Sequence, residues 1–281
     1  MNTTPSPVVV GIAGDQVAVV RWAVAEAERL KRPLRVVHSW AMPSMGAEAY
    51  GVADTTTLLR TGAELVLENA RTLVDRLAPT LDADFVIEYG STANVLIQES
   101  RDAVSLVVGS DDASWAGRLL GGELSAHLGR AGRCPVVVVP ERLEPGTGTA
   151  GVVVAIDGET SAAGPLRYAF EQADSRGVRV LVLHCVTASS TVAEFTAHRA
   201  NLAEVIAGWQ EQFPGVEVDR ATAEGHVADG CIDATARAEL LVLGHHHGRS
   251  RPSDVLHPVA AAVLRGARCP VALVPLDYAL A

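Results

Sequence analysis

The chain repeats one pattern of segments twice, and this repeat limits its architecture more than any other feature. The offset between the copies is 146 residues at Arg21 and Arg167 and 135 residues at Arg133 and Arg268. The paired segments are 8–14 with 152–158, 21–27 with 167–173, 34–39 with 180–185, 105–109 with 240–244, and 133–140 with 268–275. An offset of this size is the length of a domain and not of a solenoid repeat. The sequence therefore predicts two similar domains, 1–143 and 151–281, joined by a linker at 144–150 rich in Gly and Thr.

Short apolar runs alternate with helical patterns in each copy. In the first copy the pattern predicts strands at 8–12, 34–38, 85–89, 106–109 and 135–139, and helices near 19–30, 58–77, 94–101 and 119–128. The strand segments are too continuously apolar to alternate, which is typical of a parallel sheet covered on both faces. We therefore expect an α/β fold of two repeated, doubly wound, five-stranded parallel-sheet domains. In such a sheet ligands bind beyond the carboxyl ends of the strands, where the winding reverses.

The charge balance excludes several functions. The formal net charge is −10, which argues against nucleic acid or an anionic membrane surface as the main partner. Lys31 is the only lysine, and the lysine-containing phosphate loop GxxxxGK[ST] is absent. The N-terminus lacks the pattern of a signal peptide, and no apolar stretch is long enough to span a membrane, so we expect a cytoplasmic protein. The four cysteines are far apart in sequence, which favours reduced, buried thiols.

Several segments together resemble the universal stress protein family. They are VVVGI at 8–12, the Arg-Trp/Tyr-Ala helix starts at 21 and 167, the strands reaching His38 and His184, LVVG at 106–109, and the Cys-Pro-Val segments at 134 and 269. The resemblance covers almost the whole chain, in tandem, and is closest to two-domain actinobacterial members. It implies a nucleotide-binding α/β layered fold. It also implies an ATP site made of a motif G-x2-G-x9-G-[S/T] after the fourth strand and an Asp at the end of the first.

The first copy matches this motif only in part. The matching residues are Gly109 and Gly122, while Asp112 and Glu123 stand in place of the second glycine and the hydroxyl residue. Ser110 follows the first glycine, Ser125 lies two residues beyond Glu123, and Ala13 replaces the Asp of the first strand. A carboxylate at a helix N-terminus is favourable for the helix but repels a triphosphate in the same space. A magnesium ion bridging the acids to the phosphates is one route that could restore ATP binding here, and a less favoured one than loss of binding.

The second copy shows the complementary loss. Asp157 is present and Gly244 matches, but His247 replaces the second glycine and His257-Pro258 replaces Gly-Ser. Proline suits the first turn of a helix but removes one N–H donor from a site that would bind phosphate through backbone amides. The residues that could contact a ligand are therefore Gly109, Ser110, Gly122, Ser125, Asp157 and Gly244.

Three functional hypotheses follow. The first is a non-enzymatic stress-response module whose clefts have degenerated, so that it binds a regulatory protein or a small anionic ligand, with ATP and magnesium held weakly. The second is an ATP-binding, weakly ATP-hydrolysing protein with at least one working cleft. The third is an interaction protein with no ligand. The apolar last strands predict pairing between 135–139 and 270–274 inside one chain, as a pseudo-dimer, and leave a homodimer open.

Other polar residues have competing interpretations. His245, His246 and His247 lack the paired Cys or carboxylate of a usual zinc site, so a solvated loop is an alternative to metal binding. A further alternative is an anion site formed by His246, His257 and the arginines at 249 and 251. His38 and His184 end equivalent strands, either as ligand contacts or bonded to a neighbouring loop. Ser110, Ser125 and His127 lack the G-x-S-x-G context of a hydrolase nucleophile.

Overall fold

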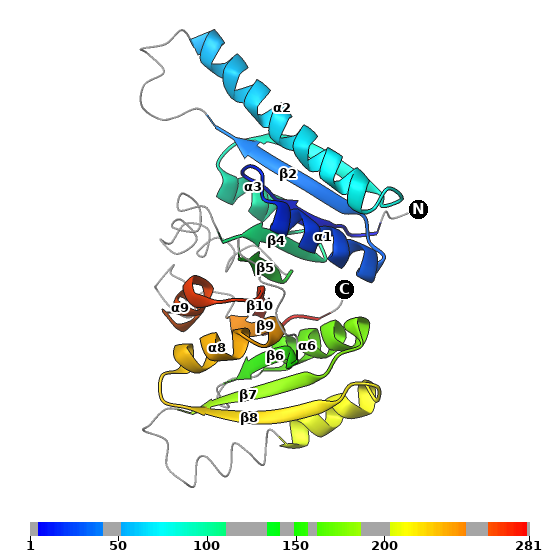
Figure 1. Ribbon diagram of the computed structural model, residues 1–281, viewed down its shortest axis with the longest axis vertical. Helices are drawn as coiled ribbons and strands as arrows, with labels where there is room; N and C mark the ends of the chain where they lie inside the picture. The colour runs from blue at the N-terminus through cyan, green and yellow to red at the C-terminus, as the bar shows by residue number, and fades with distance from the viewer. Residues whose placement is uncertain are drawn as a thin grey trace. The chain divides into compact units, whose positions relative to one another are not determined.

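The computed structural model describes residues 5–41, 52–110, 134–140, 149–156, 162–186, 203–245 and 258–279. The chain divides into two compact units, Met1–Cys134 and Pro135–Ala281 (Figure 1). Each unit contains a parallel arrangement of strands connected through helices, as the alternation of apolar runs and helical patterns predicts. Among the described residues no helix is both long and apolar enough to cross a membrane.

The first unit is a four-stranded parallel arrangement in the order β3-β2-β1-β4. Its described elements are β1 (Val8–Gly11), α1 (Val17–Leu30), β2 (Leu34–Trp40), α2 (Val52–Leu77), β3 (Ala83–Tyr89), α3 (Thr92–Glu99) and β4 (Ser105–Gly109). All residues of β1 and β4 are buried, which accounts for their continuously apolar sequences. Helices α1 and α2 pack against each other and against the strands.

The second unit is a six-stranded arrangement in the order β5-β10-β9-β6-β7-β8. Its described elements are β5 (Val136–Val139), β6 (Gly151–Ile156), α6 (Ala163–Arg176), β7 (Val180–Val186), a helical segment at 203–212, β8 (Val218–Glu224), α8 (Val227–Thr235), β9 (Ala238–His245), α9 (Pro258–Gly266) and β10 (Val271–Pro275). Strand β5 pairs antiparallel with β10, with Ala272 opposite Val137. The predicted pairing of the last strands is therefore confirmed.

The five strands and the first three helices predicted for the first copy are confirmed, with shifted ends. Helix α3 begins at Thr92 and not near Asn94, because the Ser91 hydroxyl accepts a hydrogen bond from the Asn94 amide at 3.4 Å and caps the helix. Strand β3 begins at Ala83 because it continues the pairing with β2, where Arg35 forms an ion pair with Asp84. The helix predicted at 119–128 lies outside the described residues.

Helices α1 and α6 end at equivalent positions with different residues. Lys31 ends α1 in the left-handed region with φ 52°, and Gly177, 146 residues later, ends α6 with φ 67°. In both places the next backbone amide bonds back to the helix, from Arg32 to Ala27 at 2.9 Å and from Val178 to Ala173 at 3.0 Å. The turn is therefore the same in both copies, but only the second has the glycine that this conformation favours.

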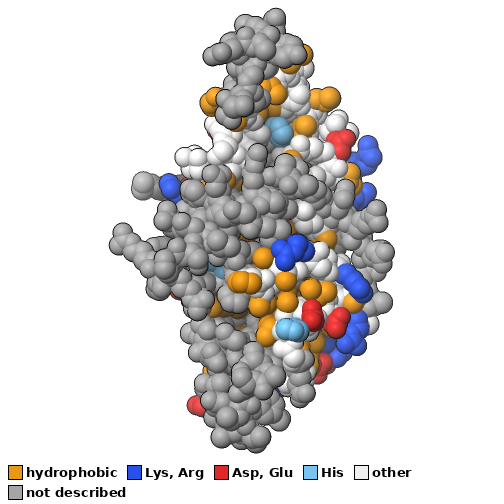
Figure 2. All heavy atoms as spheres, turned by 90° about the vertical axis from the view of Figure 1, so that its left-hand side faces the viewer, with side chains coloured by type: hydrophobic (Ala, Val, Ile, Leu, Met, Phe, Trp, Pro, Cys, Tyr) orange, Lys and Arg blue, Asp and Glu red, His pale blue; other side chains and the backbone are white. Residues whose placement is uncertain are grey.

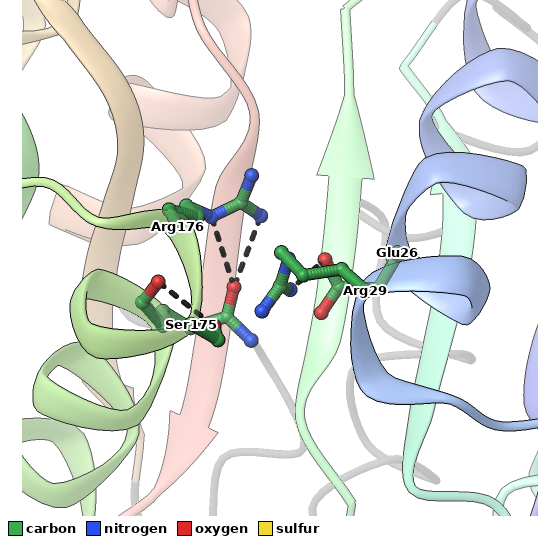
Figure 3. A network of polar contacts seen from close by, with 5 residues as sticks. Glu26, Arg29, Ser175 and Arg176 are labelled. Atoms are coloured by element: carbon green, nitrogen blue, oxygen red, sulfur yellow. Dashed lines mark hydrogen bonds and ion pairs between the residues drawn. The ribbon is translucent and has the colours of Figure 1, made fainter.

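The same two helices bury a polar side chain at another equivalent position. Glu26 is 1% exposed and Gln172 is 3% exposed. Glu26 is paired with Arg29, while the Gln172 carbonyl oxygen Oε1 accepts from Nη2 of Arg176 at 3.0 Å (Figure 3). Each polar group is thus bonded to an arginine about one turn further along its helix, as a buried polar group requires.

Candidate functional site: the carboxyl ends of the strands

The winding of each unit reverses beside its first strand. In the first unit β1 lies between β2 and β4, with Gly11 opposite Val108 of β4. In the second unit β6 lies between β7 and β9, with Ala155 opposite Leu243. The crevice beyond these carboxyl ends is where a doubly wound sheet places a ligand, so each unit has one such place.

In the first unit, a glutamine side chain lies across this crevice. Gln16 precedes α1, and its Oε1 accepts a hydrogen bond from the Ala13 amide at 2.9 Å. A methyl group built on Gly109, at the end of β4, would lie 2.6 Å from Nε2 of Gln16 and 3.0 Å from Cγ2 of Val19. The carboxamide therefore links the loop after β1 to the end of β4. Sequence reasoning missed Gln16, because nothing in its local context distinguishes it from any polar residue at a helix start.

The loop that contains Gln16 is tied down at two further points. The Gln16 amide donates to the Gly14 carbonyl at 2.8 Å. Asn69 of α2 donates through Nδ2 to the Asp15 carboxylate at 3.1 Å. The backbone of the loop is therefore held both by a local turn and by the neighbouring helix.

Polar and aromatic side chains follow at the ends of β2 and β3. His38 is half-buried and donates from Nδ1 to the Ile12 carbonyl at 2.9 Å, so the structure shows the loop-bonded alternative for this residue. Beside it, Trp40 and Tyr89 form an edge-to-face pair with ring centroids 5.0 Å apart, and Tyr89 is 65% exposed. This aromatic pair was not predicted from the sequence: Tyr89 ends the predicted strand 85–89, but Trp40 lies two residues beyond the predicted strand 34–38.

In the second unit, the segment after β10 lies beside the end of β9, where Gly244 is exposed. Leu276 donates its amide to the His245 carbonyl at 3.1 Å and accepts from the Gly164 amide at 3.2 Å. A methyl group on Gly244 would lie 2.8 Å from Cδ2 of Leu276 and 3.0 Å from Cγ of Pro165. Leu276 therefore bridges β9 and the first turn of α6, next to the glycine that was predicted to contact a ligand. Sequence reasoning missed Leu276 because it lies outside the motif.

Aromatic and polar contacts hold the same segment further along. The Tyr278 hydroxyl donates to Oε2 of Glu171 at 3.2 Å, and its ring packs edge-to-face on Tyr168 with centroids 5.6 Å apart. Burial raises the pKa of Glu171, an effect that Arg167 opposes through its ion pair at 2.9 Å and the Tyr278 hydroxyl opposes through its hydrogen bond. The C-terminal segment, residues 275–278, is thus attached to both β9 and α6.

Three of the six predicted ligand residues are among the described residues, and all three lie at or next to the ends of strands. Gly109 ends β4 and Gly244 lies near the end of β9, as expected, and Ser110 directly follows Gly109. Gly122, Ser125 and Asp157 lie outside the described residues. So do Asp112, Glu123, His127, His246, His247 and His257. Helix α9 begins at Pro258, in agreement with the preference of proline for a first turn.

The cysteines among the described residues are poorly placed to react as thiolates. Cys134, Cys231 and Cys269 are buried and form no disulfide bond, as the sequence predicts. Burial raises the pKa of both Cys134 and Cys269 to about 12, so neither thiol is ionised appreciably near neutral pH. Within the described part of the chain, no group of three His, Cys, Asp or Glu side chains could hold a metal ion.

Charged side chains of both signs lie close together on the described surface. Figure 2 shows Lys and Arg side chains beside Asp and Glu side chains among hydrophobic ones. Among the ion pairs of the described residues, Arg179 pairs with Asp219 at 2.9 Å and with Glu217 at 3.9 Å. Paired charges of this kind present a mixed surface to a partner.

The fold, with one crevice in each unit where the winding of the sheet reverses, defines a tandem doubly wound α/β protein. The model of the universal stress protein family matches residues 6–140 and 151–275. The chain therefore belongs to the universal stress protein family, as a tandem member.

Relatives of known sequence share this tandem organisation. The chain is 30% identical over 291 residues to universal stress protein Rv2623 of Mycobacterium tuberculosis, with 94% of each chain covered. It is 29% identical over 296 residues to a universal stress protein of Mycolicibacterium smegmatis, covering 97% of this chain and 98% of that one. A solved universal stress protein from Archaeoglobus fulgidus shares the fold, with a TM-score of 0.72, 16% identity, and coverage of 96% and 98%.

Proposed function

We propose that the chain is a cytoplasmic, non-enzymatic stress-response module in which neither ancestral nucleotide cleft binds ATP tightly. It acts through a regulatory protein partner or a small anionic ligand. One observation carries the proposal: the chain's own residues lie against both glycines that begin the ATP motif. Gln16 and Val19 contact the position of Gly109, while Leu276 and Pro165 contact that of Gly244.

The replaced motif residues support the same conclusion. Family members that bind ATP use glycines so that backbone amides approach the phosphates. Here Asp112 and Glu123 add negative charge to the first copy, and Ala13 removes the carboxylate expected to hold the adenosine. In the second copy, His247 and His257 add side chains where close approach of the backbone is needed.

Calorimetric titration with ATP, with and without magnesium, tests this proposal. We expect a dissociation constant weaker than about 100 μM for the intact chain in both conditions. Low-micromolar affinity would overturn the proposal and favour the ATP-binding alternative, which Asp157→Ala and Ser125→Ala would then assign to one copy. ATP turnover above background that disappears in Gly122→Trp would favour the hydrolytic form of that alternative.

We also propose domain boundaries in the sequence at 1–143 and 151–281, with the linker at 144–150, because the family matches stop at 140 and resume at 151. With these boundaries β5 belongs to the first domain in sequence, although it is part of the second compact unit, where it pairs with β10. The antiparallel pairing of β5 with β10 supports an internal pseudo-dimer. A protease site inserted in 144–150 tests it. The two fragments are expected to stay together on size-exclusion chromatography after cleavage, whereas separate elution would contradict the pseudo-dimer.

A further inference from the structure

We infer that Gln16 is the residue that closes the nucleotide cleft of the first copy and sets its ligand specificity. This inference deepens the proposed function and depends on it. The carboxamide of Gln16 takes both the hydrogen-bond donor and the space that a ligand would need at the reversal point of the sheet. Removing it should therefore restore affinity for a nucleotide.

The two ends of the carboxamide act on opposite sides of the crevice. Oε1 accepts from the Ala13 amide at 2.9 Å, at the carboxyl end of β1. At the end of β4, Nε2 and Cδ lie 2.6 Å and 3.4 Å from the point where a Cβ of Gly109 would be. A glycine at this place leaves room for close backbone approach by a ligand, and in this chain the glutamine takes up that room.

The backbone around Gln16 keeps the side chain in this position. Gln16 is the residue before the first turn of α1, where no side-chain oxygen caps the helix, and the Val20 amide donates to its carbonyl at 3.1 Å. Asn69 holds the preceding Asp15 at 3.1 Å. The loop is therefore anchored on both sides of Gln16, and the direction of the side chain follows from it.

The connection between β1 and α1 is also short. The offset between the copies is 144 residues at Val8 and Val152 but 146 at Arg21 and Arg167, so this connection is two residues shorter in the first copy. The residue 146 positions after Gln16 is Ala162, which has no side chain that could reach across the second crevice. A glutamine at this position is thus found only in the first copy, and in the second copy Leu276 and Pro165 lie against the equivalent glycine, Gly244.

Opening this cleft would expose two backbone features that suit an anionic or polar group. One is the Ala13 amide, which becomes a donor without a side-chain acceptor. The other is the uncovered surface of Gly109. A nucleotide presents phosphate and ribose oxygens that such donors bind. The occupant that Gln16 excludes is therefore a nucleotide, and magnesium ATP and AMP are the probes.

The decisive variant is Gln16→Ser. Serine is a preferred residue at the position before a helix, so this change supports the start of α1, but its hydroxyl is too short to cover Gly109. Gln16→Glu keeps the length and the acceptor and adds a negative charge that repels phosphate. Gln98→Ser is the matched control, because Gln98 is exposed on α3.

Binding of magnesium ATP and AMP to the full chain is measured by calorimetry. Gln16→Ser is expected to bind at least one probe about tenfold more tightly than the unchanged chain or more, while Gln16→Glu and Gln98→Ser are expected to match it. Hydrogen exchange at the Ala13 amide is expected to accelerate in Gln16→Ser, which reports opening independently of the ligand.

The outcomes separate the two proposals. If the unchanged chain binds ATP in the low-micromolar range, the proposed function fails. If the unchanged chain binds weakly and Gln16→Ser, folded to the same melting temperature, binds no better, the proposed function stands and the role of Gln16 is refuted. Equal gains in Gln16→Ser and Gln98→Ser would also refute it, because the effect would then not come from the cleft.

Discussion

The contact between Gly164 and the C-terminal segment predicts a large effect for a single methyl group. Gly164 lies in the first turn of α6, where a Cβ would be 2.3 Å from the Pro275 carbonyl oxygen and 2.7 Å from the Leu276 carbonyl oxygen. Both neighbours are backbone atoms, so no side-chain rotation relieves the overlap. Gly164→Ala must therefore displace the segment that contacts Gly244, or shift α6 itself.

The size of the effect follows from three contributions. Overpacking at a well-packed position costs about 1–3 kcal/mol in unfolding free energy. Loss of the hydrogen bond from the Gly164 amide to the Leu276 carbonyl costs about 1 kcal/mol more. Alanine gains at most about 1 kcal/mol over glycine in a helix. The expected net destabilisation is therefore about 1–3 kcal/mol.

Urea unfolding measures this change in unfolding free energy, and the melting temperature from a separate thermal unfolding experiment checks it. Gly208→Ala is the matched control, because Gly208 is a helical, exposed glycine of the same unit and a Cβ there would meet nothing within 4 Å. The control is expected to gain about 0.5–1 kcal/mol. If Gly164→Ala is as stable as Gly208→Ala, the close backbone contact of Gly164 is refuted, and so is the contact of Leu276 with Gly244 that depends on it.

Three further predictions concern single residues. Lys31→Gly should stabilise the chain by about 1 kcal/mol in urea unfolding, and Gly177→Lys should destabilise it similarly, because both positions are left-handed; equal stabilities would contradict this. Burial raises the pKa of Glu171, so the folded state holds this proton to a higher pH than the unfolded state. The contribution of Glu171 to stability should then fall as the pH rises from about 4 toward 7, and in Glu171→Gln this slope should be absent; an unchanged slope argues against the burial effect. Because the pKa of Cys269 is raised to about 12, iodoacetamide at about pH 8 should label it only after unfolding, as peptide mass spectrometry can check; rapid labelling of the native chain would show that the thiol is accessible.

Much of the fold could be predicted because the repeat and the apolar runs are both encoded locally. Buried strands such as Val8–Gly11 and Val136–Val139 are nearly uniform runs of valine, which few other structures accommodate. The pairing of β5 with β10 was predictable for the same reason, since an apolar edge needs a partner. Element ends were less predictable, because pairing between Arg35 and Asp84 involves residues distant in sequence.

The site could be predicted only where a motif coincides with a strand end. Gly109 and Gly244 were found because glycine follows an apolar run in both copies. Gln16 and Leu276 could not be found in this way. Each residue is placed against a strand-end glycine by the tertiary packing of the sheet, which the local sequence does not show. Glutamine in a loop and leucine after a strand are also common, so neither residue type is distinctive.

Different parts of the chain contact the equivalent glycines of the two copies, although Gly109 is buried and Gly244 is exposed, and this difference has a practical consequence. In the first copy a side chain before α1 does so, and in the second a segment after β10 does so, with backbone hydrogen bonds to His245 and Gly164. Because no residue is shared, a substitution at Gln16 changes one cleft and a substitution at Gly164 changes the other. Binding measured in these two variants can therefore be assigned to one copy at a time, which the near-symmetry of the repeat would otherwise prevent.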